Sequence, residues 1–147
     1  VVSANPYYHY ILSDIYSAQW LGPDRGSQMV RLGSLERHGV PFALHSDSPM
    51  APLSPLTLAY NASNRITING HQTGARERIS LDAALRAITI DAAWVIGWED
   101  EIGSVRAGKR ADFTVLESDP YQVGASGLRD IAIWGTVFEG ELFPLDH

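Results

Sequence analysis

The segment 40–49 constrains the fold of this chain more than any other part of the sequence. Its first five residues carry neither a charge nor a hydrogen-bonding side chain, which is typical of a strand covered on both faces of a parallel sheet. His45 and Asp47 follow directly, and Pro49 prevents further ladder pairing. The reacting groups of parallel α/β folds lie at the carboxyl ends of strands. The segment therefore predicts a buried strand that delivers Asp47 into a loop.

A second strand and a helix are predicted upstream. Residues 1–4 have the composition of a strand tail that Asn5-Pro6 ends, and the aromatic residues 7–10 follow in a predicted loop. Residues 24–38 place apolar side chains close to one helical face, and Gly39 is a typical helix stop. Strand, helix and strand in this order form a βαβ unit, so the two strands should be parallel.

Further helices are predicted after the Asp47 loop. Pro55 suits the first turn of a helix that runs to about residue 65. The clearest helical pattern spans 81–96, with Ser80 as its N-cap and apolar residues at helical spacing. The Pro-, Gly- and Ser-containing segment 117–127 is predicted to be a loop.

The pattern changes to short strands towards the end of the chain. Residues 113–116 form one predicted strand, and residues 130–138 and 142–143 form a hairpin around Glu139-Gly140. We therefore expect two parts: an α/β part, residues 1–98, and a small β part.

Composition excludes several classes of function. A net charge of −6 and a pI near 5.2 argue against a nucleic-acid partner. The absence of cysteine excludes disulfides and thiolate metal sites. No apolar run reaches the ~20 residues that span a bilayer, so no membrane partner is expected, and the cytoplasm is the default compartment. Because the sequence opens within a strand and without Met, we expect a piece of a longer protein.

Asp47 and His45 are the first candidates for chemistry. A carboxylate at a strand end binds a divalent metal or takes a proton from metal-bound water, whereas a structural Asp begins a turn or caps a helix. His45 lies two residues earlier, so in a strand both side chains point to the same side. The alternative for His45 is a core histidine bonded to a backbone carbonyl.

The other candidates come from the first strand and its surroundings. His9 follows that strand and could line the same mouth, or it packs among the aromatic residues. Tyr8 belongs to an aromatic group that forms either a substrate wall or part of the core. Arg65 is either a surface charge or a contact for an anionic substrate. A metal site needs about three protein ligands. Up to Asp47, only His9, His45 and Asp47 stand in suitable positions.

Taken together, the sequence resembles the C-terminal portion of the amidohydrolase superfamily, in the group of metal-dependent hydrolases described as YtcJ-like. The resemblance covers essentially the whole chain, in the order of the family. It rests on Asn-Pro-Tyr-Tyr at 5–8, His-Ser-Asp-Ser-Pro-Met at 45–50, Ala-Leu-Arg-Ala-Ile-Thr-Ile-Asp-Ala-Ala at 84–93, and Ile-Gly-Ser-Val-Arg-Ala-Gly-Lys-Arg-Ala-Asp-Phe-Thr-Val-Leu-Glu-Ser-Asp-Pro at 102–120.

The resemblance implies an α/β fold: the C-terminal part of a (β/α)8 TIM barrel together with the C-terminal strands of a small β-sandwich. Residues 1–98 correspond to barrel strands seven and eight with the helices that follow, and residues 99–147 to the sandwich. Asp47 matches the strand-eight aspartate, which in the family ligates the metal and carries a proton from the hydrolytic water to the leaving nitrogen. His45, Tyr8 and His9 are the implied substrate-pocket residues.

The resemblance also implies what this segment lacks. The family's His-x-His after strand one and its ligands after strands four to six have no counterpart here, and about three quarters of a ~250-residue barrel are missing. The implied parent is a hydrolase of non-peptide carbon–nitrogen bonds with a divalent metal, zinc by preference, and a small amide-like substrate. The segment alone is expected to be inactive and to bind no metal.

Exposed strand edges and apolar helix faces favour self-association of such a segment. Two other functions remain open. The chain is either a non-catalytic structural or interaction module, or one subunit of a two-chain enzyme whose partner supplies the histidines.

Overall fold

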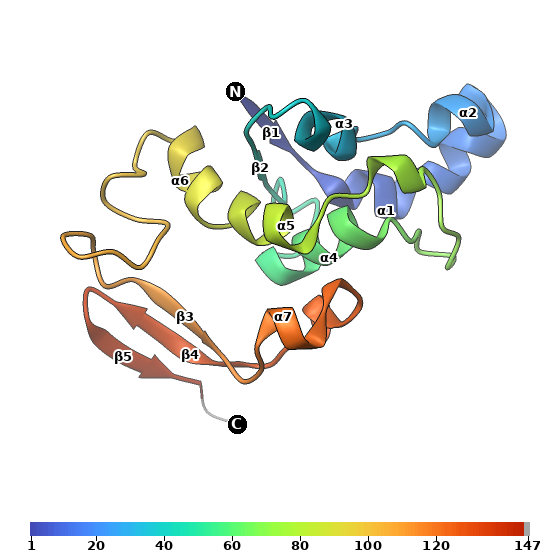
Figure 1. The fold of residues 1–147 in the computed structure, drawn as a ribbon. Helices are drawn as coiled ribbons and strands as arrows, with labels where there is room; N and C mark the ends of the chain where they lie inside the picture. The colour runs from blue at the N-terminus through green and yellow to red at the C-terminus, as the bar shows by residue number, and fades with distance from the viewer. Residues whose placement is uncertain (146–147) are drawn as a thin grey trace.

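The computed structural model describes residues 1–145, which form two small sheets with helices between them (Figure 1). In the first sheet, β1 (Val2–Ala4) pairs with β2 (Phe42–Leu44). The pairing is parallel, as predicted, with Val2 opposite Phe42 and Ala4 opposite Leu44. The second sheet is antiparallel and has the order β3 (Phe113–Leu116), β4 (Ile133–Phe138), β5 (Glu141–Pro144). The predicted C-terminal hairpin is therefore confirmed.

Helix α1 (Pro6–Ile15) begins directly after β1, so the prediction of a loop at residues 7–10 is wrong. The Asn5 side chain accepts a hydrogen bond from the Tyr7 amide, and Pro6 stands at the first helical position, where its missing N–H costs nothing. These two residues start a helix as well as ending a strand. A π-helical segment, η1 (Tyr16–Leu21), continues α1.

The single helix predicted at 24–38 is replaced by two short ones, α2 (Gly22–Gly26) and α3 (Leu32–Arg37). Between them Val30 adopts a left-handed backbone with φ 52°, which a helix cannot contain. The predicted stop at Gly39 is confirmed, because this residue has φ 63° just after α3.

Helix α4 (Pro55–Asn64) matches its prediction, and η2 (Ala75–Glu77) follows it. The helix predicted at 81–96 is divided into α5 (Leu81–Ala87) and α6 (Ile90–Val95). At the break, Thr89 leaves helical geometry, and its hydroxyl donates to the Leu85 carbonyl at 2.7 Å. The break has a local cause, since a threonine hydroxyl competes with the helix for its carbonyls.

The segment predicted as a loop at 117–127 contains α7 (Pro120–Val123) and the start of η3 (Ala125–Asp130). Asp119 caps α7 by accepting from the Tyr121 amide at 2.8 Å. The pairing of an acidic or amide cap with a following proline, seen at the start of α1, recurs here.

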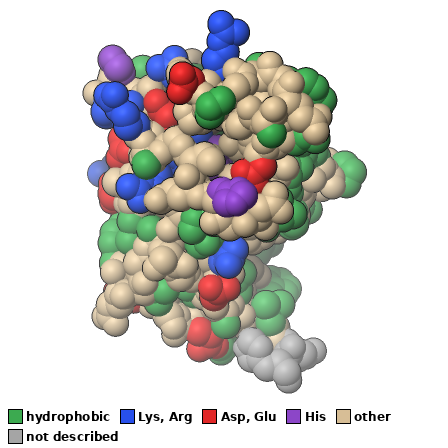
Figure 2. Space-filling model, turned by 90° about the vertical axis from the view of Figure 1, so that its right-hand side faces the viewer, with side chains coloured by type: hydrophobic (Ala, Val, Ile, Leu, Met, Phe, Trp, Pro, Cys, Tyr) green, Lys and Arg blue, Asp and Glu red, His purple; other side chains and the backbone are tan. Residues whose placement is uncertain are grey.

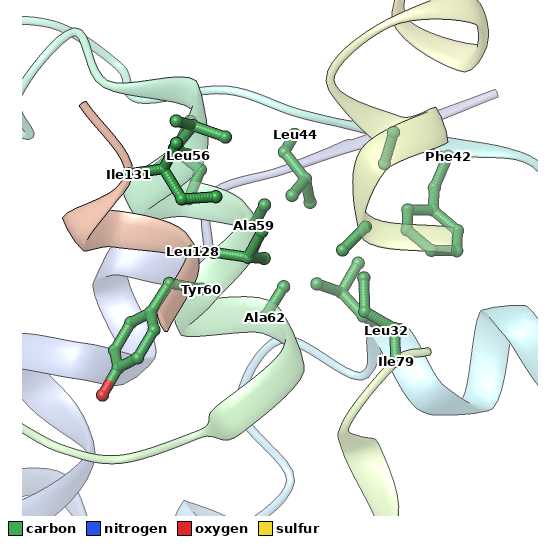
Figure 3. Close-up of a cluster of buried hydrophobic side chains, with 13 residues drawn as sticks. Leu32, Phe42, Leu44, Leu56, Ala59, Tyr60, Ala62, Ile79, Leu128 and Ile131 are labelled. Carbon is green, nitrogen blue, oxygen red and sulfur yellow. The ribbon is translucent and has the colours of Figure 1, made fainter. Parts of the chain in front are cut away.

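Helix α4 lies at the centre of the hydrophobic core, between β2 on one side and η3 on the other (Figure 3). Leu128 and Ile131, from the second part of the chain, therefore pack with the first part. Thirteen buried residues form this core: Leu32, Phe42, Leu44, Leu56, Leu58, Ala59, Tyr60, Ala62, Ile79, Ala84, Ala87, Leu128 and Ile131.

The surface seen from the α2 side interleaves acidic and basic side chains with hydrophobic ones (Figure 2). This face carries no uniform basic stripe of the kind that binds nucleic acid. Within residues 1–145, no helix is long and apolar enough to cross a membrane.

Candidate functional site

The carboxyl ends of β1 and β2 lie side by side because the two strands are parallel. Pairing continues one step past the sheet, where the His45 amide donates to the Ala4 carbonyl at 3.0 Å. This edge of the sheet is where the sequence predicts the reacting groups.

Three hydrogen bonds from side chains join the end of β1 and the residues after it to the segment that follows β2. They are Ser3 Oγ to His45 Nδ1 at 2.8 Å, Asn5 Nδ2 to the Ser46 carbonyl at 2.9 Å, and Tyr8 Oη to Asp47 Oδ2 at 2.9 Å. Ser3, Asn5 and Tyr8 follow one another in the first segment, and their partners are the consecutive residues 45–47 of the second. The loop that carries Asp47 is therefore fixed to the start of α1.

Asp47 has an exposed side chain on a left-handed backbone with φ 54°. Its carbonyl accepts from the Met50 amide at 2.8 Å, so the backbone of Asp47 does begin a turn. Its carboxylate caps no helix, since Ser54 caps α4. Oδ2 accepts the Tyr8 hydroxyl, and Oδ1 has no hydrogen-bond partner among residues 1–145. One carboxylate oxygen is thus free to accept a proton or a cation.

His45 and Tyr8 lie beside Asp47. His45 is exposed and bonded to the Ser3 hydroxyl rather than to a backbone carbonyl, which sets aside the core-histidine alternative. The Tyr8 ring is half-buried. The hydrogen bond to Asp47 and the negative charge of that carboxylate both raise the pKa of the Tyr8 phenol above its usual value. Tyr8 therefore remains a donor to Asp47 at neutral pH.

His9 makes its contacts elsewhere. Its side chain is 1% exposed, with Nε2 at 2.7 Å from the Thr73 hydroxyl, which lies 3.1 Å from Ser13 Oγ. Nδ1 is buried without a hydrogen-bond partner among the described residues. Burial, with a smaller contribution from the charge of Arg65, lowers the pKa of His9 to about 4. These contacts favour the packing alternative for this residue.

Arg65 forms a buried structural centre that sequence reasoning missed. It is 1% exposed, so it is neither a surface charge nor open to an anionic substrate. Its guanidinium donates at 2.8 to 3.2 Å to backbone carbonyls of Ser27, Met29, Val30 and Thr73. Burial lowers the pKa of Arg65 to about 10, which leaves it charged at neutral pH. No sequence signal distinguishes this arginine from a surface one.

The described residues do not make a complete metal centre. Residues 1–145 bring together no group of three or more His, Cys, Asp or Glu side chains that could hold a metal ion. Asp47 offers one free oxygen, which fits a single ligand position. Any metal bound at this edge would need further ligands from outside the described residues.

Comparison with known proteins identifies the family of the chain. Residues 2–143 match the model of the amidohydrolase family. The N-substituted formamide deformylase of Arthrobacter pascens is 31% identical over 140 residues, which are 95% of this chain and 26% of that protein. The putative amidohydrolase YtcJ of Bacillus subtilis (strain 168) is 30% identical over 138 residues, which are 91% of this chain and 26% of that protein.

A solved structure gives the same result. An uncharacterized metal-dependent hydrolase from Pyrococcus furiosus matches with a TM-score of 0.58 at 28% identity, over 74% of this chain and 21% of that one. The predicted resemblance to YtcJ-like amidohydrolases is confirmed. The chain spans about a quarter of the length of the curated relatives it matches.

Proposed function

Since this chain belongs to the amidohydrolase family, we propose that it is the C-terminal part of a metal-dependent hydrolase of non-peptide carbon–nitrogen bonds. In this proposal residues 1–98 supply barrel strands seven and eight with the helices that follow, and residues 99–147 supply the C-terminal strands of a β-sandwich. The parallel β1–β2 pair and the antiparallel β3–β4–β5 sheet support that division. Residues 146–147 lie outside the described residues.

The free Oδ1 of Asp47, at the carboxyl end of a parallel strand, is the observation that carries the proposal. Asp47 is one ligand of a divalent metal, zinc by resemblance, and also the proton carrier. Water adds to the carbonyl carbon, and Asp47 takes the proton that the water loses. When the carbon–nitrogen bond breaks, Asp47 returns the proton to the leaving nitrogen. A bound metal would make the water acidic enough to react near neutral pH.

The proposed substrate is a small amide-like molecule. One relative is named for its action on N-substituted formamides, which supports this class. Tyr8 and His45 flank Asp47 and form the near wall of the pocket, while His9, the next residue of α1, is buried. The segment alone is inactive in this proposal, because the remaining metal ligands belong to the rest of the protein.

The experiment replaces Asp47 by Asn in the full-length protein that contains this chain. Hydrolysis of an N-substituted formamide should fall by at least about a thousandfold, because Asn cannot carry the proton. His45→Ala should lose much less, since the His45 side chain bonds to the Ser3 hydroxyl and, among residues 1–145, makes no hydrogen bond to Asp47. Turnover that survives in Asp47→Asn would refute the proton-carrier role, and an equally severe loss in His45→Ala would make His45 a catalytic partner.

A second candidate function is an interaction module, and one feature of the surface favours it. A groove of about 490 Å³ lies between β1, which is an edge strand of its two-stranded sheet, and helix α3, lined mainly by apolar side chains such as Val2, Leu35 and Val40. A strand edge with an apolar groove beside it tends to pair with another chain. We propose that the isolated chain self-associates here. Sedimentation velocity should show dimers or larger species that Val2→Lys converts to monomer, whereas a monomeric wild type would contradict it.

A further inference from the structure

We infer that Tyr8 is a positioning residue for Asp47: its hydroxyl holds one carboxylate oxygen and leaves the other for the reaction. This inference rests on the proposed function of Asp47. It adds to the site a tyrosine from the first turn of α1, the helix that follows the neighbouring strand β1.

The carboxylate of Asp47 has a single anchor. Tyr8 Oη donates to Oδ2 at 2.9 Å, and Oδ1 has no hydrogen-bond partner in the part of the chain that the structure describes. A carboxylate has two equivalent oxygens that both accept hydrogen bonds and bind cations. Without the Tyr8 bond, the exposed side chain would rotate and present either oxygen. With it, Oδ1 alone is offered.

Tyr8 is itself fixed relative to the Asp47 loop. The Asn5 side chain accepts from the Tyr7 amide and so starts the helix that carries Tyr8. The same side chain donates to the carbonyl of Ser46, the residue before Asp47. Both ends of the Tyr8–Asp47 bond are therefore held by Asn5, which is 4% exposed. A group fixed in this way orients its partner at little cost in entropy when the reaction occurs.

The neighbouring tyrosines of α1 have a different role. The rings of Tyr7 and Tyr10 pack with their centroids 5.1 Å apart, and neither hydroxyl bonds to another described residue. Removing the Tyr7 hydroxyl therefore changes the same helix without touching Asp47. Tyr7→Phe is the matched control for Tyr8→Phe.

Kinetics of the metal-loaded full-length protein test the inference. With an N-substituted formamide as the probe, Tyr8→Phe should lower kcat about tenfold, the loss expected when a hydrogen bond to a charged group disappears. KM should stay unchanged, because the bond orients the reacting group and does not hold the substrate. Tyr7→Phe should match the wild type. In an Asp47→Asn background, adding Tyr8→Phe should cause no further loss.

Two other readouts separate positioning from folding. Metal content by atomic emission should be the same in Tyr8→Phe as in the wild type, and thermal unfolding should show that the variant is fully folded at the assay temperature. In the 147-residue chain, the Met50 amide, which bonds to the Asp47 carbonyl, should exchange its hydrogen faster in Tyr8→Phe than in Tyr7→Phe. Wild-type kcat in Tyr8→Phe, with Asp47→Asn inactive, would overturn the positioning role and leave the proposed function intact. An active Asp47→Asn would overturn both.

Discussion

Asp47 and Arg65 are two charged residues in nearly the same backbone setting, and the structure uses them in opposite ways. Each follows a regular element, β2 or α4, and each has a left-handed backbone, with φ 54° and 52°. Arg65 is buried and donates to carbonyls from two loops. Asp47 is exposed and accepts one side-chain hydrogen bond, and its other carboxylate oxygen has no partner among the residues that the structure describes. A charge whose hydrogen-bonding capacity is filled by backbone groups has a structural role, and an unfilled one at a strand end remains available for chemistry.

Replacing Arg65 should have the largest effect on stability. Arg65→Met keeps most of the side-chain volume but removes four hydrogen bonds to backbone carbonyls, of which only that of Val30 keeps another donor among the described residues, the Leu32 amide. Unfolding should therefore cost about 3 kcal/mol less, or the chain should not fold. Urea denaturation measures this loss. The control is Arg78→Met. The exposed Arg78 side chain bonds, among residues 1–145, only to the Ala75 carbonyl, so its loss should change the free energy of unfolding by less than about 0.5 kcal/mol. Equal stabilities of the two variants would contradict the structural role of Arg65.

His9 should make stability depend on pH. Its pKa is about 4 in the folded chain and 6.5 as the ordinary value, so the unfolded chain binds more protons between these limits. The folded state is favoured fully above pH 6.5 and loses on the order of 3 kcal/mol as pH falls to about 4. His9→Gln should lack this component of the pH profile. Parallel profiles for the two proteins would show that His9 is not buried in its neutral form.

The ionisation of the Tyr8 phenol should have the smallest effect on stability. Its pKa is raised by Asp47, so the folded state holds this proton more strongly, and the contribution is lost as pH rises through the folded pKa. In ultraviolet titration, the component that Tyr8→Phe removes should ionise at a higher pH than an ordinary tyrosine. Asp47→Asn should bring the Tyr8 pKa down, since it removes the negative charge. A Tyr8 pKa that does not respond to Asp47→Asn would mean that the two side chains do not touch.

Sequence patterns predicted the parts of the fold that rest on local apolar runs. The two parallel strands and the C-terminal hairpin followed from runs of apolar residues with clear turn signals, and helix α4 followed from the proline in its first turn. Helices α1 and α7 were missed because Asn5-Pro6 is also typical of a strand end, and the Pro, Gly and Ser residues around Asp119-Pro120 are also typical of a loop. The same pairs are helix starts, with the first residue as cap and proline at the first helical position.

Two helices, at 24–38 and 81–96, were predicted as continuous but are divided. The first is broken where a long-range contact occurs, and the second has a local cause. At Val30 the chain leaves helical geometry where Arg65, 35 residues further on, binds the Val30 carbonyl. The spacing of apolar residues over a short stretch of sequence cannot reveal a contact between residues that are 35 positions apart. At Thr89 the hydroxyl's bond to the Leu85 carbonyl was visible in principle, because threonine inside a helix carries this tendency.

The candidate site was only partly predictable. Asp47 and the strand that positions it follow from the apolar run and the residues after it. The Tyr8–Asp47 bond, the displacement of His9 towards Thr73 and the burial of Arg65 depend on how α1, α4 and the loops pack. Spacing along the sequence carries no information on these contacts.

The measurement that tests the central comparison most directly is the free energy of unfolding of the 147-residue chain with Asp47→Asn, set beside that of Arg65→Met. Asn keeps an oxygen that accepts from Tyr8 and tolerates the left-handed backbone. We expect the free energy of unfolding of Asp47→Asn to lie within about 1 kcal/mol of the wild type. A loss as large as that of Arg65→Met would show that Asp47 holds the fold together, and its assignment as the free functional carboxylate would be wrong.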